Sequence, residues 1–583
     1  MIKRLSACIR EYKKQTILTP VCMVGEVVCE CTIPLLTADL INSIQNGCDL
    51  RTILLYGLKL FVIAMLSLGF GALSGWFAAE AAAGFAKNLR HDLYYQVQSF
   101  SFANIDRFST SSLVTRLTTD VTNIQNAFMM CIRIAVRAPM MLVFAVIMSI
   151  RVGKQLAFIF AGTVPILGLA LFFMIRSALP LFKAVFKKYD ALNNSVQENV
   201  QGMRVVKSFV REDYETQKFS AASDSVRADF LKAEKILALN SPVMQFCVYT
   251  SMILISFFAA KLIVTSGGTY LGVGSLTSMI TYSMQILMSL MMLSTIFVML
   301  TMAQASGKRI CEVLGETSSL HNPENPVYEV PNGAVDFDHV EFKYSASAKR
   351  STLSDIDFHV KSGQTVGIIG GTGSAKTTLV QLIPRLYDTS RGTVRVGGKD
   401  VRAYDLAALR DAVNIILQKN VLFSGTVREN LKWGNVDASD EEIWEACRAA
   451  CADEFLNRMP DGLDTVLEQG ASNLSGGQKQ RLCIARALIG KAKILIFDDS
   501  TSAVDTATEK KIREALAARK NVTKIIIAQR VTSVMNTDQI IILDDGKVHR
   551  IGTHAELLAD DPIYQEIYAS QMKGGDENGS ESL

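Results

Sequence analysis

Residues 370–377 read Gly370-Gly-Thr-Gly-Ser-Ala-Lys-Thr377. They follow a short apolar run, 365–369, and precede a stretch with a helical pattern, 378–386. A glycine-rich turn between a strand and a helix points backbone N–H groups and the helix N-terminus at phosphate. In such a loop Lys376 reaches the β- and γ-phosphates, and the hydroxyl of Thr377 binds Mg²⁺. The stretch therefore predicts a phosphate-binding loop in an α/β domain.

One position in this loop departs from the usual pattern. The residue before the lysine is normally glycine, and here it is Ala375. A methyl group is tolerated at such a position if the local φ and ψ suit alanine. We therefore expect nucleotide binding to survive the replacement.

The chain around the loop has the pattern of an α/β domain. From residue 333 onward, short β-branched runs alternate with helical patterns. One of these runs, Ile-Leu-Ile-Phe-Asp at 494–498, ends in Asp498, which fits the second Mg²⁺ ligand of phosphate-loop ATPases. Before the domain, 316–332 is polar and contains three prolines, as expected of a linker. After it, 573–583 is mostly glycine, serine and acidic residues, and we expect disorder.

The first 315 residues have a different character. Hydrophobic residues make up 49% of the chain and charged residues 20%, which favours a membrane part joined to a water-soluble part. A helix needs about 20 apolar residues to cross the bilayer. Six stretches meet or approach that length, and they predict six membrane spans: 16–44, 60–79, 126–150, 155–175, 236–264 and a final one from 275.

The distribution of Lys and Arg predicts the orientation of these spans. Basic residues concentrate in the N-terminal segment and in the two long connections, 80–125 and 176–235, so these face the cytoplasm. Six spans then place both termini in the cytoplasm of a multi-pass cell-membrane protein. The long connections carry candidate small cytoplasmic connectors at 112–120 and 210–219. Dense Lys/Arg runs are absent from the sequence, so we expect no nucleic-acid partner.

A second motif, Leu-Ser-Gly-Gly-Gln at 474–478, identifies the family. Together with the phosphate loop it closely resembles the ATP-binding-cassette (ABC) family, whose signature is LSGGQ, and the resemblance covers the whole chain. It implies a six-helix exporter domain (1–315), a linker (316–332), a nucleotide-binding domain with a helical subdomain (333–572) and a tail (573–583). It also implies ATP and Mg²⁺ as cofactors, and two cassettes that meet head to tail. Each ATP would then lie between one phosphate loop and the partner's signature.

The resemblance assigns further residues singly. Tyr344 looks like the aromatic residue that stacks on adenine, Gln418 like the residue that senses Mg²⁺ and the membrane domain, and Asp505 like the loop aspartate that crosses to the partner's site. The expected metal ligands are Thr377, Gln418 and Asp498. The expected nucleotide-binding residues are Tyr344, Gly370, Thr372, Gly373, Ser374, Ala375, Lys376, Thr377, Thr378, Ser475, Gly476, Gly477, Gln478 and Asp505.

Two positions break the family pattern. The family's general base is a Glu directly after the Mg²⁺ aspartate, and here it is Asp499. The family's switch histidine is here Gln529, which cannot change protonation as histidine does. Displacing a catalytic carboxylate by about 1 Å can cost about 100-fold in rate. We therefore predict that the site on this chain's own phosphate loop, with Asp499, Gln529 and Gln418 in the catalytic positions, hydrolyses ATP slowly.

The pattern predicts one half of a heterodimeric exporter. The partner would be a second ABC half-transporter with the missing Glu and His, and the substrate a small amphipathic drug or a lipid-like compound moved by alternating access. Three alternatives stay open: a lipid flippase, a peptide exporter, and an ATP-binding regulatory or sensor subunit that moves nothing itself.

Two acidic residues in the first span are candidates for a substrate site. Glu26 and Glu30 lie four residues apart, on one face of the expected helix. Carboxylates are costly in a membrane and favour a bundle interior or a water-filled cavity. They either attract cationic substrates or form a hydrogen-bonded structural pair. For Arg133 and Arg137 we expect side chains that extend to the membrane interface.

Overall fold

The computed structural model describes residues 1–266, 271–345, 347–499 and 505–576. The chain divides into two compact units. Unit 1 comprises residues 1–98 and 109–316, and unit 2 comprises 99–108 and 317–583. The domain boundaries expected from the sequence place all of the first 315 residues together, whereas the short segment 99–108 belongs to unit 2.

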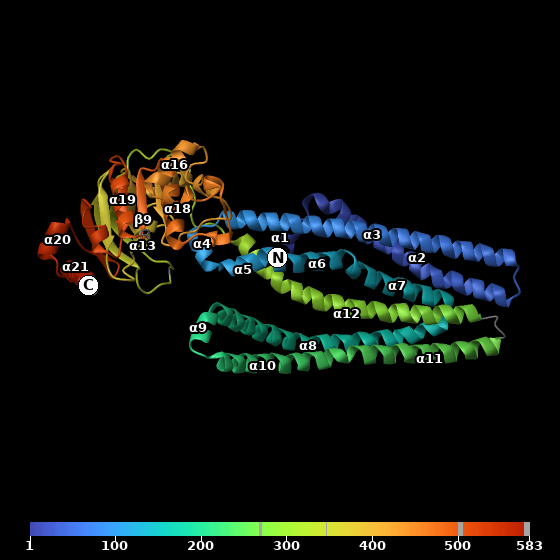
Figure 1. The fold of residues 1–583 in the computed structure, drawn as a ribbon. Coiled ribbons are helices and arrows are strands. Elements are labelled where there is room, and N and C mark those ends of the chain that lie inside the picture. Colours follow the sequence, from blue (N-terminus) through green and yellow to red (C-terminus); the bar gives the residue numbers. More distant parts are fainter. Residues whose placement is uncertain (267–270, 346, 500–504, 577–583) are drawn as a thin grey trace. The chain divides into compact units, whose positions relative to one another are not determined.

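Unit 1 is helical (Figure 1). Within the described residues, six segments are long and apolar enough to cross a membrane: Arg10–Gln45, Leu50–Gln98, Thr110–Val152, Lys154–Phe182, Glu212–Thr265 and Val273–Gly315. They include the six stretches predicted from the sequence. The helices are α1 (Ile2–Ala7), α2 (Lys13–Gln45), α3 (Leu50–Gln98), α5 (Thr110–Thr115), α6 (Val121–Ile132), α7 (Ile134–Val152), α8 (Lys154–Gln201), α9 (Met203–Ser208), α10 (Glu212–Ala238), α11 (Asn240–Ser266) and α12 (Val273–Gly315), with short turns η1 (Arg10–Tyr12) and η2 (Arg116–Asp120).

The apolar sequence runs of unit 1 form its core. One buried cluster joins α2, α7, α8, α11 and α12, and within it the hydroxyl of Tyr282 donates to the carbonyl of Cys31 at 2.8 Å. A second cluster joins α8, α11 and α12 around Leu167 and Leu287. Helices α8 and α10 lie side by side, with α9 at the turn between them (Figure 1).

Both small connectors lie earlier in the chain than predicted. The first is α4 (Phe102–Arg107), not 112–120, which instead continues the helical path through α5 and η2. It begins at a capping box in which Ser101 and Asn104 satisfy each other's backbone N–H groups, a signal that the sequence analysis missed. The second is α9 at 203–208, not 210–219. After α9, Val210 has a φ of +50°, which is a rare conformation for a β-branched residue. No sequence pattern predicts this conformation.

The described residues of unit 2 form a six-stranded sheet, a four-stranded sheet and a two-stranded pair of β7 and β8. The order of the six-stranded sheet is β12-β11-β3-β10-β9-β6, in which only the β11–β12 pair is antiparallel. A four-stranded antiparallel sheet has the order β2-β1-β4-β5. The strands are β1 (Val335–Phe342), β2 (Leu353–Val360), β3 (Thr365–Ile369), β4 (Arg391–Val396), β5 (Lys399–Asp400), β6 (Val413–Ile416), β7 (Gly425–Thr426), β8 (Val466–Leu467), β9 (Ile494–Asp498), β10 (Thr523–Ile527), β11 (Gln539–Asp544) and β12 (Lys547–Gly552).

Helices cover these sheets and form a subdomain with its own core. The helices are α13 (Lys376–Gln381), α14 (Leu406–Ala412), α15 (Val427–Leu431), α16 (Asp440–Ala449), α17 (Asp453–Leu456), α18 (Gly476–Ile489), α19 (Thr506–Ala517), α20 (His554–Asp560) and α21 (Pro562–Asp576). Apolar residues of α15 to α18 pack together in one buried cluster that also reaches β9. Helix α21 extends through the first residues of the expected tail, and 577–583 lie outside the described residues.

Candidate nucleotide site

The parallel strands bring the predicted residues to one edge of the six-stranded sheet. Ile527 of β10 pairs with both Ile368 of β3 and Asp498 of β9. The segments that follow these three strands therefore emerge together at the carboxyl edge, where ligands bind in open α/β sheets. These segments are the phosphate loop, Asp499 and the turn that contains Gln529.

The loop backbone has the shape of a phosphate cradle. Gly373 has a φ of +85°. A side chain on Gly370 would put its Cβ 2.1 Å from the carbonyl oxygen of Leu543, so this position accepts only glycine. Ala375 also adopts the left-handed conformation, with φ +70° and ψ +26°, and caps α13. The chain therefore builds the loop with alanine in a backbone state that glycine adopts more easily.

The side chains of the loop converge on its centre. Lys376 Nζ donates to the carbonyls of Gly370 and Gly371 at 2.9 and 2.8 Å and to Ser374 Oγ at 3.3 Å. Burial lowers the pKa of Lys376, and the charges of Asp499 and Asp498 oppose that shift. Thr372 is exposed and Ser374 is buried. The lysine thus occupies the space that its loop encloses, hydrogen-bonded to atoms that line it.

Asp498 has the environment of a metal ligand. It is 1% exposed, and its Oδ1 accepts from the hydroxyl of Thr377 at 3.0 Å. Its Oδ2 is buried without a hydrogen-bond partner among the described residues. Burial raises the pKa of Asp498, and the Thr377 hydrogen bond opposes this shift. An orphaned carboxylate oxygen beside a threonine hydroxyl fits Mg²⁺, which takes hard oxygen ligands.

Asp499 and Gln529 contact each other directly. Gln529 Nε2 donates to Asp499 Oδ2 at 2.7 Å, and Gln418 also hydrogen-bonds to this carboxylate. Burial raises the pKa of Asp499, while Gln529, Lys376 and the other neighbours lower it. Gln571 of α21 supports the turn, because its amide donates to the carbonyl of Gln529 at 2.8 Å. The three predicted catalytic positions therefore form one hydrogen-bonded cluster.

Tyr344 lies close to the phosphate-loop helix. Its hydroxyl is 2.9 Å from Thr378 Oγ1, and its ring is half exposed. It makes edge contacts with Phe342 and Tyr387, with ring centroids 4.9 and 5.3 Å apart. The aromatic neighbours fix one edge of the ring and leave a face for a flat ligand.

The signature residues form the start of a different helix. Ser475 caps α18 in a capping box with Gln478, through bonds of 2.8 and 3.3 Å. A Cβ on Gly476 would meet no atom within 4 Å, so this helix start is open on its surface. Asp505 caps α19, where it accepts from Thr508 N at 3.0 Å. The residues before Asp505 in its predicted motif, 500–504, lie outside the described residues.

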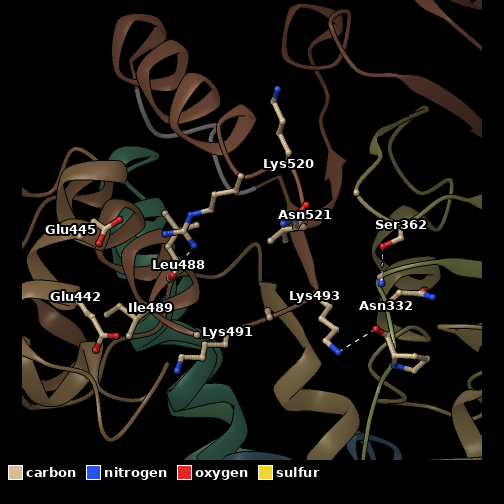
Figure 2. Close-up of a pocket in the computed structure, with 17 residues that line it drawn as sticks. Asn332, Ser362, Glu442, Glu445, Leu488, Ile489, Lys491, Lys493, Lys520 and Asn521 are labelled. Carbon is tan, nitrogen blue, oxygen red and sulfur yellow. Dashed lines mark hydrogen bonds between the residues drawn. The ribbon is translucent and has the colours of Figure 1, made fainter.

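A separate cavity of about 710 Å³ lies at the opposite, amino edge of the same sheet (Figure 2). It is lined by residues that precede β3, β9 and β10. Two of its cationic side chains donate hydrogen bonds to main-chain carbonyls. Lys493 donates to the carbonyl of Val330, and Arg519 donates to the carbonyl of Leu488 at 2.9 Å. This cavity is distinct from the phosphate site, and its cations hold segments of unit 2 together.

The acidic pair of unit 1 is bound to an arginine. Arg137 of α7 donates to Glu26 at 2.5 Å and to Glu30 at 2.7 and 2.8 Å, both on α2. The sequence analysis expected Arg137 to extend to the membrane interface, and it did not anticipate this pairing. Its only sequence signal was the presence of opposite charges in two apolar stretches.

Fold and site together define a phosphate-loop ATPase joined to a bundle of membrane-length helices. The comparisons with known proteins identify the family. Residues 16–290 match the ABC transporter transmembrane region, and 353–502 match the ABC transporter domain. The chain is 38% identical over 560 residues to the uncharacterized ABC transporter ATP-binding protein YfiB of Bacillus subtilis, covering 96% of each. The chain therefore belongs to the ABC transporter family.

Two further comparisons show a similar fold and a similar sequence. A solved bacterial Atm1-family ABC exporter with ATP bound shares the fold, with a TM-score of 0.81, 23% identity and coverage of 97% of this chain and 99% of that one. An ATP-dependent lipid A-core flippase of Aromatoleum aromaticum is 31% identical over 529 residues, covering 89% of this chain and 86% of the flippase. The protein is an ABC half-transporter with six membrane-length helices among the described residues and one ATP-binding domain.

Proposed function

We propose that this chain is the hydrolysis-impaired half of a heterodimeric exporter in the cell membrane, with its nucleotide-binding domain and both termini in the cytoplasm. The observation that carries the proposal is the 2.7 Å hydrogen bond between Asp499 and Gln529. A catalytic carboxylate must accept a proton from, or orient, the attacking water. Here the carboxylate is shorter than glutamate, and two amides bind it.

Binding of ATP and Mg²⁺ does not depend on this defect. Thr377 and Asp498 would hold the ion, with Gln418 close by, and the loop from Gly370 to Lys376 would hold the phosphates. The bound Mg²⁺ would neutralise charge on the β- and γ-phosphates. The chain's own contribution is a loop whose main-chain N–H groups would face the phosphates and whose lysine is already hydrogen-bonded to the loop's carbonyls. We infer a site that retains ATP and turns it over slowly.

The signature would serve a second site. Ser475 and Gly477 stand at the N-terminus of α18, a 14-residue helix whose dipole favours anions. In a head-to-tail pair they would contact the γ-phosphate on the partner's phosphate loop. The partner would supply the Glu and His that this chain lacks. Hydrolysis there would reset an alternating-access cycle that ATP-driven cassette closure begins.

For the substrate we propose small amphipathic drugs or lipid-like compounds. Similarity to a lipid A-core flippase supports lipid translocation as the second candidate. Accumulation of a labelled substrate in vesicles that contain the paired complex, dependent on ATP, distinguishes export from a subunit that only senses ATP. A complex that binds ATP without moving any lipid or amphipathic probe would support the sensor alternative.

The proposal predicts that restoring the family residues restores hydrolysis. We expect the double substitution D499E and Q529H to raise phosphate release by the purified chain in lipid nanodiscs by up to about 100-fold. ATP affinity, measured separately, should change little, because the phosphate loop is untouched. Adding Lys376→Ala to the double variant should abolish the gain. Fast hydrolysis by the unmodified homodimer would contradict the proposal.

A further inference from the structure

A cavity of about 740 Å³ lies between α8 and α12 in unit 1. Its size is within the range of about 300–1,000 Å³ that small-molecule sites occupy. Its walls are leucine, isoleucine and phenylalanine side chains with one glycine, and they include a single charged residue, Arg176. A cavity that combines an apolar wall with one cation suits an amphipathic anion.

The cavity lies at a definite depth along both helices. Arg176 is 22 residues after Lys154, the first residue of α8, which corresponds to about 33 Å of helix. Leu290 and Phe297 are 17 and 24 residues after Val273, the first residue of α12, or about 26 and 36 Å. Because the hydrocarbon core is about 30 Å thick, Leu290 lies within it, whereas Arg176 and Phe297 lie just beyond it, at headgroup level.

The side chains of the cavity are open to an occupant. Phe172 and Phe297 are 56% and 49% exposed, whereas Leu171 and Leu290 behind them are 7% and 9% exposed and belong to a buried cluster. Arg176 is exposed, and within the described ranges of the chain no hydrogen bond or ion pair involves it. Arg137 differs, because Glu26 and Glu30 neutralise it.

We propose that this cavity binds a membrane lipid with an anionic headgroup. The guanidinium of Arg176 would pair with the phosphate or carboxylate of the headgroup, and an acyl chain would lie against Phe172. The inference deepens the proposed function, on which its orientation in the membrane rests, by naming anionic lipid as the substrate class. It favours an anion over the cationic substrate that Glu26 and Glu30 suggested.

Native mass spectrometry of the full-length chain, without nucleotide, tests the proposal. The probes are dioleoyl-phosphatidylglycerol and dioleoyl-phosphatidylcholine, which share acyl chains and differ in net charge. We expect tighter binding of phosphatidylglycerol and a roughly tenfold to hundredfold loss of that affinity in Arg176→Gln, with phosphatidylcholine unaffected. Arg176→Lys should keep much of the preference. Arg151→Gln, at the end of α7, is the matched control and should change nothing.

Phe172→Ala separates the acyl contact from the headgroup contact, because it should lower the binding affinity of both lipids to a similar degree. Equal affinity for the two lipids, or an Arg176→Gln variant with an unchanged melting temperature and unchanged phosphatidylglycerol binding, would overturn the proposal. So would displacement of the lipid by millimolar inorganic phosphate, since a free anion would then be the ligand. Because the assay needs neither hydrolysis nor partner, fast ATP turnover by the homodimer would sink only the proposed function.

Discussion

Ala375 holds a left-handed backbone conformation, φ +70° and ψ +26°, at the position where the phosphate loop turns into α13. This conformation costs a non-glycine residue about 1–2 kcal/mol. The sequence analysis made tolerance of the methyl group depend on this φ and ψ, and the structure shows that the position carries strain.

Replacing Ala375 by glycine should relieve that strain. We expect Ala375→Gly to stabilise unit 2 by about 1 kcal/mol, as a higher melting temperature, and to leave ATP binding intact or slightly tighter. The matched control is Ala515→Gly in the last turn of α19, where alanine has helical geometry and glycine should cost up to about 1 kcal/mol. A lower melting temperature for the first variant would show that Ala375 is not strained.

Asp498 makes the stability of unit 2 depend on pH when neither nucleotide nor Mg²⁺ is bound. Burial raises its pKa, so the folded state holds a proton more tightly than the unfolded state does. Ionisation therefore costs stability as pH rises from the ordinary Asp pKa through the raised folded value, and the cost is absent below the ordinary pKa. The cost arises in the nucleotide-free protein because Asp498 Oδ2 is buried and has no hydrogen-bond partner among the described residues.

Asp498→Asn should remove that cost. We expect the variant to be more stable than the parent at pH 7 without nucleotide or Mg²⁺, by about 1 kcal/mol or more. The difference should shrink as pH falls toward about 4, where the parent's carboxyl group is protonated. Thermal unfolding across pH 4–8 measures both effects. A stability difference that is constant with pH would contradict the sign worked out here.

At the scale of elements, α4 is the clearest case of a helix that its surroundings hold. It has only six residues, too few to persist alone. Asn104 donates to the carbonyl of Thr317 at 3.1 Å, Ser101 contacts Ser319 at 2.8 Å, and Asp106 accepts from the hydroxyl of Tyr387 at 2.6 Å. These contacts explain why 99–108 belongs to unit 2.

Removing the Tyr387 hydroxyl should loosen α4 selectively. We expect Tyr387→Phe to lower hydrogen-exchange protection of residues 99–108 by roughly tenfold, the cost of one hydrogen bond to a carboxylate. Tyr404→Phe is the control, because its buried hydroxyl donates to Val396 at 2.8 Å within the four-stranded sheet, away from α4. It should lower the stability of unit 2 as a whole. Equal protection of α4 in the parent and in Tyr387→Phe would show that the other contacts suffice.

At the scale of the whole molecule, the proposed function separates two abilities: hydrolysis on this chain's own phosphate loop and completion of the partner's site. Asp499 and Gln529 stand beside the chain's phosphate loop and bind each other. Its signature is intact, and a capping box closes the start of the helix that follows. Under the proposed function, hydrolysis by the pair then depends on one signature more than on the other.

Blocking the signatures one at a time tests this asymmetry. In the pair reconstituted with its partner, Ser475→Arg should abolish most ATPase activity, because this signature completes the competent site. The equivalent substitution in the partner's signature should cost much less, since that signature completes the slow site. Phosphate release from both pairs in proteoliposomes decides the matter, and equal losses would indicate two equivalent sites.

Local pattern was enough to predict much of this protein. The phosphate loop, the signature and the six spans each occupy a continuous stretch whose chemistry can be read without its neighbours, and the fold and family predicted from them are confirmed. The two connectors begin at residues 102 and 203, ten and seven residues before the predicted starts at 112 and 210. Their position depends on a short capping box and on Val210, which holds a positive φ against its own preference.

The sequence by itself determined which chemical groups this chain contains: a phosphate loop, an intact signature, and Asp and Gln where the family has Glu and His. Only the tertiary structure decided how those groups meet. Glu26 and Glu30 bind Arg137, which is more than 100 positions away in the chain. Asp106 binds Tyr387, and Asp499 binds Gln529, which follows the neighbouring strand. The physical reason is that the energy of a polar group depends on its partner and its burial, and both are set by elements distant in the chain.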